Sequence, residues 1–191
     1  MNIDDRRIRR TRKVLREALA ELIQKKELHS ITVQELSDKA DVHRATFYAH
    51  YKDIYDLYQQ MEDSAVEELS AILVYDSSQT YEAIFQSLIN YIYENQKVFQ
   101  AFLLNPKFMN RIVAQAEKNY SVMWQDDLGD LVFSDEWIFL SRYHIQGCLA
   151  IITHWIETGY SRPKEEIIKL ISSVDKCFDK FISSARGGIN F

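Results

Sequence analysis

Residues 32–53 constrain the fold of this 191-residue chain more than any other segment, because they hold two short helical patterns joined by a turn. Thr32 and Glu35 form a capping box, in which each side chain can satisfy a free backbone N–H. Apolar residues then recur at helical spacing as far as Ala40, whose small side chain permits close approach of another helix. Asp41 stands where the chain must turn, and Asp accepts the left-handed conformation better than most residues, though less well than glycine.

A second short helix is expected from Arg44 to His50, with Phe47 turned toward the core. Its other side chains are then free to face outward, and Asp53 is placed to cap the helix that follows. A tight turn between two short helices, with a basic residue opening the second, is typical of a helix-turn-helix, whose second helix can lie in the major groove of DNA. The alternative is an ordinary solvated face of a small helical bundle, since surface Arg and Thr are common.

The outward side chains carry the groups that DNA recognition needs. Arg44 can pair with guanine through two hydrogen bonds, and Ala45 is small enough to touch a thymine methyl group. Hydroxyl and ammonium groups suit phosphate oxygens, which fix the register of a protein on DNA without reading its sequence. The candidate DNA-binding residues are Thr32, Val33, His43, Arg44, Ala45, Thr46, Tyr48, His50 and Lys52.

Residues 8–57 resemble the amino-terminal domain of the tetracycline-repressor-like (TetR) family of bacterial transcription factors. The matching positions are a helix over about 8–25, Ile31-Thr32-Val33, Leu36, Ala40, Val42, Thr46, Phe47-Tyr48, Tyr51 and Leu57. The resemblance implies an all-helical dimer with a divergent carboxy-terminal domain for ligand binding and dimerisation. The chain departs from the family pattern where Asp41 replaces a usual glycine, Ile54 a usual lysine and His43 a common capping serine.

Charge is unevenly distributed along the chain. The net charge is −5, but residues 1–60 carry a balance of +2 and residues 61–191 a balance of −7. The basic residues near the start are Arg6, Arg7, Arg9, Arg10, Arg12, Lys13 and Arg16. Such a segment ahead of a recognition unit can bind phosphates or enter the minor groove; the alternative is a solvated, partly disordered tail.

The rest of the chain follows helical periodicity almost throughout, with no glycine or proline before Pro106. We expect an all-α fold of about nine helices in two domains. Residues 1–52 would form a three-helix, helix-turn-helix DNA-binding domain, and residues 53–191 a helical ligand-binding and dimerisation domain.

Capping residues, glycines and prolines predict the helix ends in the second domain. A polar stretch over 75–80 and a loop over 127–134 are expected to interrupt the helices. Asp135 is expected to cap a long helix that Gly159 ends, and Pro163 to lie in the first turn of a last helix. Gly187-Gly188 is expected to close that helix.

The last two helices are predicted to form a homodimer interface. The last helix carries a regular apolar stripe, and the helix before it is apolar on nearly every face, so it needs several partners. Two such helices from each subunit would make a four-helix bundle, although both could instead pack only within the subunit. The predicted interface residues are Ile145, Leu149, Ile152, Ile156, Ile167, Leu170, Ile171, Val174, Phe178 and Phe181.

A pocket for a small-molecule effector of unknown identity is expected among the helices over about 80–158. Aromatic side chains with a few polar groups suit small-molecule binding, although such residues more often form plain core. The candidates are Tyr91, Phe102, Tyr120, Met123, Trp124, Tyr143, His144 and Trp155. The Trp155–Gly159 stretch, with Pro163 and Glu165-Glu166 after it, resembles a carboxy-terminal region of some Firmicutes members of the TetR family, and the resemblance names no ligand.

Other classes of protein find little support in the sequence. There is no catalytic or metal-binding motif, so we expect neither an enzyme nor a cofactor. The two cysteines, Cys148 and Cys177, lie in apolar helical patterns and are expected to be small buried hydrophobes rather than a redox or metal pair. The charged amino terminus and the absence of a long apolar span predict a cytoplasmic protein without membrane contact.

Two functions therefore remain. The first is a ligand-responsive, sequence-specific transcriptional regulator, expected to be a repressor, that binds double-stranded DNA with an inverted repeat. The second is a relative that acts as a coactivator or protein-binding module without direct DNA contact, which the departures at Asp41, His43 and Ile54 leave open.

Overall fold

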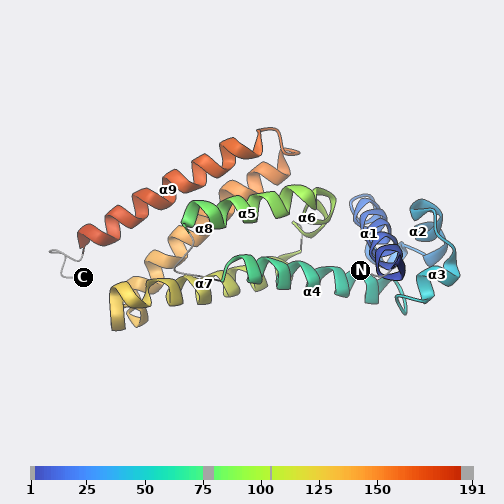
Figure 1. Ribbon diagram of the computed structural model, residues 1–191, viewed down its shortest axis with the longest axis horizontal. Helices are drawn as coiled ribbons and strands as arrows, with labels where there is room; N and C mark the ends of the chain where they lie inside the picture. The colour runs from blue at the N-terminus through green and yellow to red at the C-terminus, as the bar shows by residue number, and fades with distance from the viewer. Residues whose placement is uncertain (1–2, 75–79, 104, 186–191) are drawn as a thin grey trace.

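The computed structural model describes residues 3–74, 80–103 and 105–185 (Figure 1). Within these residues there are nine α-helices and no β-strand, which confirms the predicted all-α fold. The helices are α1 (Ile3–Ile23), α2 (Val33–Ala40), α3 (Arg44–Tyr48), α4 (Ile54–Ile72), α5 (Tyr81–Glu94), α6 (Gln96–Phe102), α7 (Pro106–Leu128), α8 (Asp135–Glu157) and α9 (Lys164–Ala185). Two short 3₁₀ helices, η1 (Leu28–Ser30) and η2 (Gly129–Phe133), lie between them.

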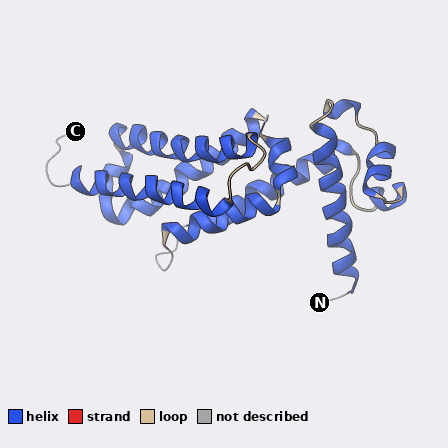
Figure 2. Cartoon of the chain, turned by 90° about the horizontal axis from the view of Figure 1, so that it is seen from above, coloured by secondary structure: helices blue, strands red, loops and turns tan. Residues whose placement is uncertain are grey.

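The first three helices lie together at one end of the molecule, and α4 leads from them into a bundle of long helices (Figure 1). α1 runs across the direction of that bundle, and α9 ends at the far end from α2 and α3 (Figure 2). The predicted domain boundary after residue 52 falls in the link between α3 and α4. One cluster of buried apolar side chains extends across this link, from Leu15 and Phe47 to Trp155 and Ile171, so the two parts share a core.

Side-chain caps set several helix ends. The oxygens of Thr32, Asp53 and Thr80 each accept a hydrogen bond from the backbone N–H three residues later, at 3.2, 2.8 and 3.3 Å. The first two caps confirm the sequence prediction. The Glu35 carboxylate forms an ion pair with Lys26, and so it is directed away from the return contact that the capping box allowed. Gly159 has φ +66° just after α8, the left-handed conformation expected of a glycine that ends a helix.

Other expected boundaries were wrong. Ser134, not Asp135, caps α8, because its hydroxyl accepts from the Trp137 backbone N–H at 3.2 Å. The predicted loop over 127–134 is mostly helical, since α7 continues to Leu128 and η2 follows. The alternative of a partly disordered basic tail does not hold for residues 3–16, which belong to α1; Arg and Lys are good helix formers, and no glycine or proline interrupts them. The expected polar break at 75–79 and the expected closing Gly187-Gly188 fall outside the described residues.

The two cysteines lie in different environments. Cys148 is buried, as predicted, whereas Cys177 is exposed, which corrects the expectation. The buried face of α9 runs through Ile171 and Phe178, and this leaves the neighbouring Cys177 on the other side of the helix. None of the helices in the described part of the chain combines the length and apolar character needed to cross a membrane.

One ion-pair cluster joins the amino-terminal unit to the bundle. The Glu21 carboxylate on α1 lies 2.5 Å from the Lys39 ammonium of α2 and 2.6 Å from the Lys97 ammonium of α6. Hydrogen bonds from Lys39, and then from Lys97, lower the pKa of Glu21 from 4.5 to about 2. A single side chain thus connects α6 of the bundle to the first helix of the helix-turn-helix.

Glu21→Gln should therefore lower the free energy of unfolding at neutral pH. The Glu21 side chain is 34% exposed, so water screens the pairs, and we expect a loss of only about 1 kcal/mol at pH 7. Because folding depresses the Glu21 pKa, the advantage of the wild type over the variant is complete above pH 4.5 and declines as pH falls toward 2. Urea unfolding at pH 7 and pH 3.5 measures both values.

Glu17→Gln is the matched control, since Glu17 is on the same helix and its only ion pair among the described residues is a loose one to Lys13 at 3.9 Å. This control should change stability by less than about 0.3 kcal/mol. A Glu21→Gln effect that is equal at both pH values would contradict the linkage.

Candidate DNA-binding surface and effector cavity

A strained turn separates α2 from α3. Asp41 ends α2 with φ +53° and ψ +49°, the left-handed conformation predicted for this position. The backbone N–H of Val42 donates to the Ser37 carbonyl at 3.0 Å, and that of Asp41 to the Asp38 carbonyl at 3.3 Å. These bonds satisfy carbonyls at the end of α2 and reverse the chain within two residues, so that α3 starts beside α2.

Phe47 anchors α3. Its ring is fully buried, and the Tyr51 ring lies 5.7 Å away between centroids. His43 precedes the helix in an extended conformation and makes no capping bond with its side chain, as its departure from the family pattern predicted. A five-residue helix without a side-chain cap cannot be stable by itself, so burial of Phe47 must hold α3 in place.

The predicted DNA-binding residues lie on one connected region of the surface: the start of α2, α3 and the turn that follows. Six of them are exposed, namely Thr32, His43, Arg44, Ala45, Tyr48 and Lys52. Val33, Thr46 and His50 are half-buried. The Arg44 guanidinium carbon lies 6.0 Å from the centroid of the exposed Tyr48 ring, so the two side chains occupy neighbouring positions on the outer face of α3.

A second basic surface runs along α1. Arg6, Arg7, Arg9, Arg10, Arg12 and Lys13 are all exposed, and α1 lies at the same end of the molecule as α2 and α3 (Figure 1). This places the positive charge of the chain near the helix-turn-helix and away from the acidic bundle.

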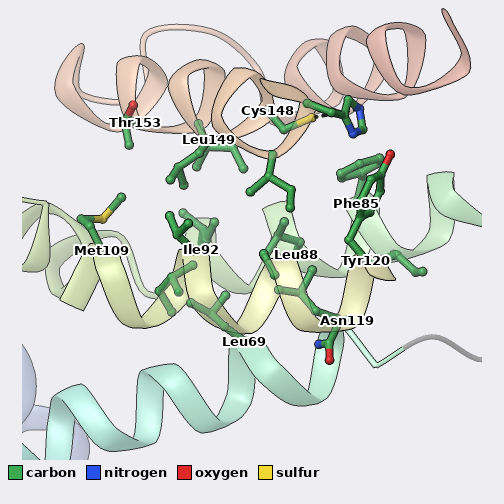
Figure 3. A pocket seen from close by; sticks show the side chains of 18 of the residues that line it. Leu69, Phe85, Leu88, Ile92, Met109, Asn119, Tyr120, Cys148, Leu149 and Thr153 are labelled. Carbon is green, nitrogen blue, oxygen red and sulfur yellow. Dashed lines mark hydrogen bonds between the residues drawn. The ribbon is translucent and has the colours of Figure 1, made fainter. Parts of the chain in front are cut away.

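The bundle encloses an apolar cavity of about 150 Å³ between α4, α5, α6, α7, α8 and α9. Leu69, Leu88, Ile92 and Leu149 point toward one another across it (Figure 3). Polar lining groups gather toward one end, where Asn119, Tyr120 and Cys148 lie, while Thr153 lies toward the other (Figure 3). His144 and Asp175 belong to the same end, because His144 contacts both Cys148 and Asp175.

His144 and Asp175 are the buried titratable groups at the polar end. They are 4% and 2% exposed, and His144 Nε2 lies 3.5 Å from Asp175 Oδ1 and 3.6 Å from Cys148 Sγ. Burial lowers the pKa of His144 to about 4 and raises that of Cys148 to about 12. Burial, followed by the nearby Asp179 carboxylate, raises the pKa of Asp175 to about 7. Within the described residues, His144 Nδ1 and Asp175 Oδ2 have no hydrogen-bond partner.

Three of the eight predicted ligand-binding residues line this cavity: Tyr120, Met123 and His144. The others lie elsewhere. Phe102, Trp124 and Trp155 are buried outside it, Tyr91 is half-buried beside a polar groove along α1, and Tyr143 is 77% exposed. The rings lie on α5, α6, α7 and α8, and helical spacing alone does not tell which apolar face of each helix borders a cavity and which packs into the core.

Only some of the predicted interface residues are exposed on the surface of the subunit. Leu170, Val174 and Phe181 are exposed on α9, at 45%, 38% and 44%. Leu149 is half-buried, and the remaining six pack inside the subunit: Ile145, Ile152, Ile156, Ile167, Ile171 and Phe178. On α8 the large exposed apolar side chains are instead Ile138, Phe139 and Tyr143, at 44%, 75% and 77%.

Asp175 and Asn119 were not among the predicted cavity residues. A signal for Asp175 exists, since it lies four residues after Ile171 and three before Phe178, on the buried stripe of its helix. Asn119 directly precedes Tyr120, but no regular apolar stripe at helical spacing surrounds it in the sequence to indicate that it lines a cavity.

An exposed helix-turn-helix at one end of an all-helical chain, with an apolar cavity in the bundle behind it, defines a class of DNA-binding transcriptional regulators. The family described as "Bacterial regulatory proteins, tetR family" matches residues 15–61, and "Transcriptional regulator C-terminal region" matches residues 79–174. The second match covers just over half of the chain, and the chain belongs to the TetR family of transcriptional regulators.

Relatives agree with this assignment. The HTH-type dhaKLM operon transcriptional activator DhaS of Lactococcus lactis subsp. lactis is 27% identical over 177 residues, which cover 88% of this chain and 92% of that protein. A solved TetR transcriptional regulator from Streptococcus agalactiae has a TM-score of 0.56 at 21% identity, covering 90% of this chain and 97% of that one. A transcriptional regulator from Aquifex aeolicus has a TM-score of 0.64 at 16% identity, covering 87% and 98%. The two solved structures show the shared fold alone.

Asp41→Gly should stabilise the helix-turn-helix. Glycine adopts φ near +53° without a clash at Cβ, so we expect the free energy of unfolding to rise by about 0.5–1 kcal/mol. Asp38→Gly is the control: it makes the same substitution inside α2, where glycine should instead cost about 0.3–0.8 kcal/mol, from lower helix propensity and from the loss of the hydrogen bond that Gln34 donates to Asp38. Urea unfolding of both variants measures the difference, and a loss of stability in Asp41→Gly would contradict the account of the turn.

Proposed function

We propose that this chain binds an inverted-repeat operator as a homodimer, and that a small molecule in the bundle cavity changes its affinity for that operator. The proposal of DNA binding rests on the two faces of α3, one buried and one exposed. Phe47 is buried, while Arg44, Ala45 and Tyr48 on the same helix are exposed. A helix anchored by one face and bearing a guanidinium, a hydroxyl and a small apolar group on the other suits the major groove.

Each exposed group has a role in this proposal. Arg44 reads guanine, and the Tyr48 hydroxyl and Lys52 ammonium bind phosphates. The first backbone N–H groups of α2, beside Thr32 and Val33, face a phosphate at the positive end of that helix. The basic surface of α1 adds sequence-independent affinity through the DNA backbone.

The exposed apolar side chains of α8 and α9 support a homodimer. Phe139 and Tyr143 on α8 continue into Gly147 on the exposed side of that helix, where a Cβ atom would meet nothing within 4 Å. Leu170, Val174 and Phe181, predicted as interface residues from the sequence, form the matching apolar face of α9. A second copy of the chain would cover both faces in a four-helix bundle and present two copies of α3.

The link between cavity and DNA supports an effector response. Phe99 and Leu103, in and just after α6, line the cavity, and Lys97 of α6 pairs with Glu21. Glu21 also pairs with Lys39 of α2. A ligand that binds one position of α6 more tightly than another would therefore bias the placement of α2 and α3, and DNA would bias ligand affinity by the same factor.

Repression and a cytoplasmic location stay predictions. The relative DhaS is named as an activator, and the sign of regulation depends on where the operator lies relative to the promoter.

Arg44→Ala should lose selectivity, whereas Lys52→Ala should lose general affinity. On an operator selected by the purified protein from random DNA, Arg44→Ala should cost about 1–3 kcal/mol relative to scrambled DNA, because one guanine pairing disappears. Lys52→Ala should weaken both complexes equally and reduce the slope of log K against log salt by about one unit, since one phosphate is no longer neutralised. Fluorescence anisotropy at several salt concentrations measures both effects, and equal losses on operator and scrambled DNA for Arg44→Ala would refute its role.

Leu170→Glu should dissociate the dimer. It places a charge on the exposed apolar face of α9, so we expect at least a tenfold weaker dimer by sedimentation equilibrium and a comparable loss of operator affinity. Ser183→Glu adds the same charge at an exposed position on another side of α9 and should leave the dimer intact. A Leu170→Glu protein that sediments as the wild type would exclude this surface as the interface.

A further inference from the structure

We propose that the effector is an amphiphilic primary amine with a straight hydrocarbon tail, whose ammonium group pairs with Asp175 at the polar end of the cavity. This inference rests on the proposed effector role of the cavity and names the class of molecule that would occupy it.

The shape of the cavity favours a hydrocarbon chain. Its lining runs along α8 from His144 to Ile156, a length of about 18 Å at about 1.5 Å per residue. Its volume of about 150 Å³ suits a slender apolar molecule. Leu88, Ile92 and Leu149 line the middle of this channel, so a tail lying between them would exchange water for apolar contacts (Figure 3).

Asp175 gives the polar end its selectivity. The residue is 2% exposed, it lines the cavity, and its Oδ2 atom has no hydrogen-bond partner among the described residues. A buried carboxylate oxygen without a donor is costly, and a ligand that donates a hydrogen bond to it would remove that cost. An ammonium group supplies both the donors and the compensating charge.

No Lys or Arg side chain lining the cavity in the described part of the chain compensates the charge of the Asp175 carboxylate. None of the residues that line the cavity in the described part of the chain is Lys or Arg. Lys176, next in sequence, is 65% exposed and reaches Glu82 at 3.4 Å, and it lowers the pKa of Asp175 less than burial and Asp179 raise it. His144, beside Asp175, is held neutral because burial lowers its pKa to about 4, and the neighbouring Asp179 adds negative charge.

The same charges argue against an anionic effector. A carboxylate or phosphate head at this end would approach Asp175 with no cation in the lining to compensate it. A neutral alcohol could donate one hydrogen bond but would leave the charge of Asp175 uncompensated above its pKa of about 7, whereas an ammonium group would stabilise the ionised form. The expected order of affinity is therefore amine, then alcohol, then carboxylate.

Three probes with one tail test this order. The full-length protein, without DNA, is titrated at pH 8.5, where Asp175 with its pKa of about 7 is ionised and an alkylammonium is still protonated. The probes for isothermal titration calorimetry are n-octylamine, 1-octanol and octanoate, each below its micelle-forming concentration or its solubility limit. We expect n-octylamine to bind at least tenfold more tightly than 1-octanol, and octanoate more weakly than either. Octanoate binding as tightly as n-octylamine, or no binding by any probe, would overturn the proposal.

Asp175→Asn assigns the preference to one side chain. In this variant n-octylamine should bind no more tightly than 1-octanol, while 1-octanol binds within threefold of the wild type, which shows that the cavity remains intact. Glu165→Gln removes a negative charge from the exposed surface of the same helix and should keep the full preference for the amine. An amine preference that survives in Asp175→Asn, or a loss of 1-octanol binding with it, would contradict the assignment. Operator binding and dimerisation are measured separately, so failure of the amine would leave those results standing.

Discussion

Burial of the Phe47 ring beneath α3 is the contact on which the DNA-binding surface depends. The helix has five residues and no side-chain cap at His43, so its own hydrogen bonds cannot hold it. Phe47 enters the same apolar cluster as Leu36 and Leu57, from the helices before and after it. Because Phe47 fixes which face of α3 is inside, it also fixes that Arg44, Ala45 and Tyr48 are outside. The turn at Asp41 brings α3 into this position. It requires a left-handed backbone conformation at Asp41, which a residue with a Cβ atom adopts less readily than glycine does.

The same core couples recognition to the bundle. The cluster that holds Phe47 continues through α4 to Ile92, Phe99 and Ile152, which line the effector cavity. At the surface, Glu21 connects α6 with α1 and α2 through two ion pairs. A change in the cavity therefore has two physical routes to α3, one through packing and one through charge, and both pass through α6 or α4. Double-mutant cycles between cavity residues and Glu21 would apportion the coupling free energy between these routes.

Local features were predictable from the sequence, and features that depend on distant packing were not. The caps at Thr32 and Asp53 and the turn at Asp41 involve residues three or four apart, so short-range rules identify them. The sequence predicts the cap of α8 one residue late, because Ser134 and Asp135 are both good capping residues and only the backbone conformation decides between them.

The residues of the proposed effector site could not be identified from the helical spacing of apolar residues alone. α8 is apolar on most faces, and nothing in its sequence separates His144, which lines the cavity, from Tyr143, which faces solvent. Asp175 looks like a surface residue by type, and only its place on the stripe between Ile171 and Phe178 indicates that it is buried. The predicted interface on α8 lies mostly inside the subunit for the same reason, while the stripe on α9 could be followed to exposed Leu170, Val174 and Phe181.

Methylation interference on the selected operator tests most directly that the outer face of α3 enters the major groove twice in each symmetric assembly. Methyl groups on guanine N7 lie in the major groove, where Arg44 would bind. The account predicts that methylation blocks binding at guanines placed symmetrically in two half-sites, about one helical turn apart or a multiple of it. Binding that tolerates methylation at every guanine, or is blocked in only one half-site, would contradict it.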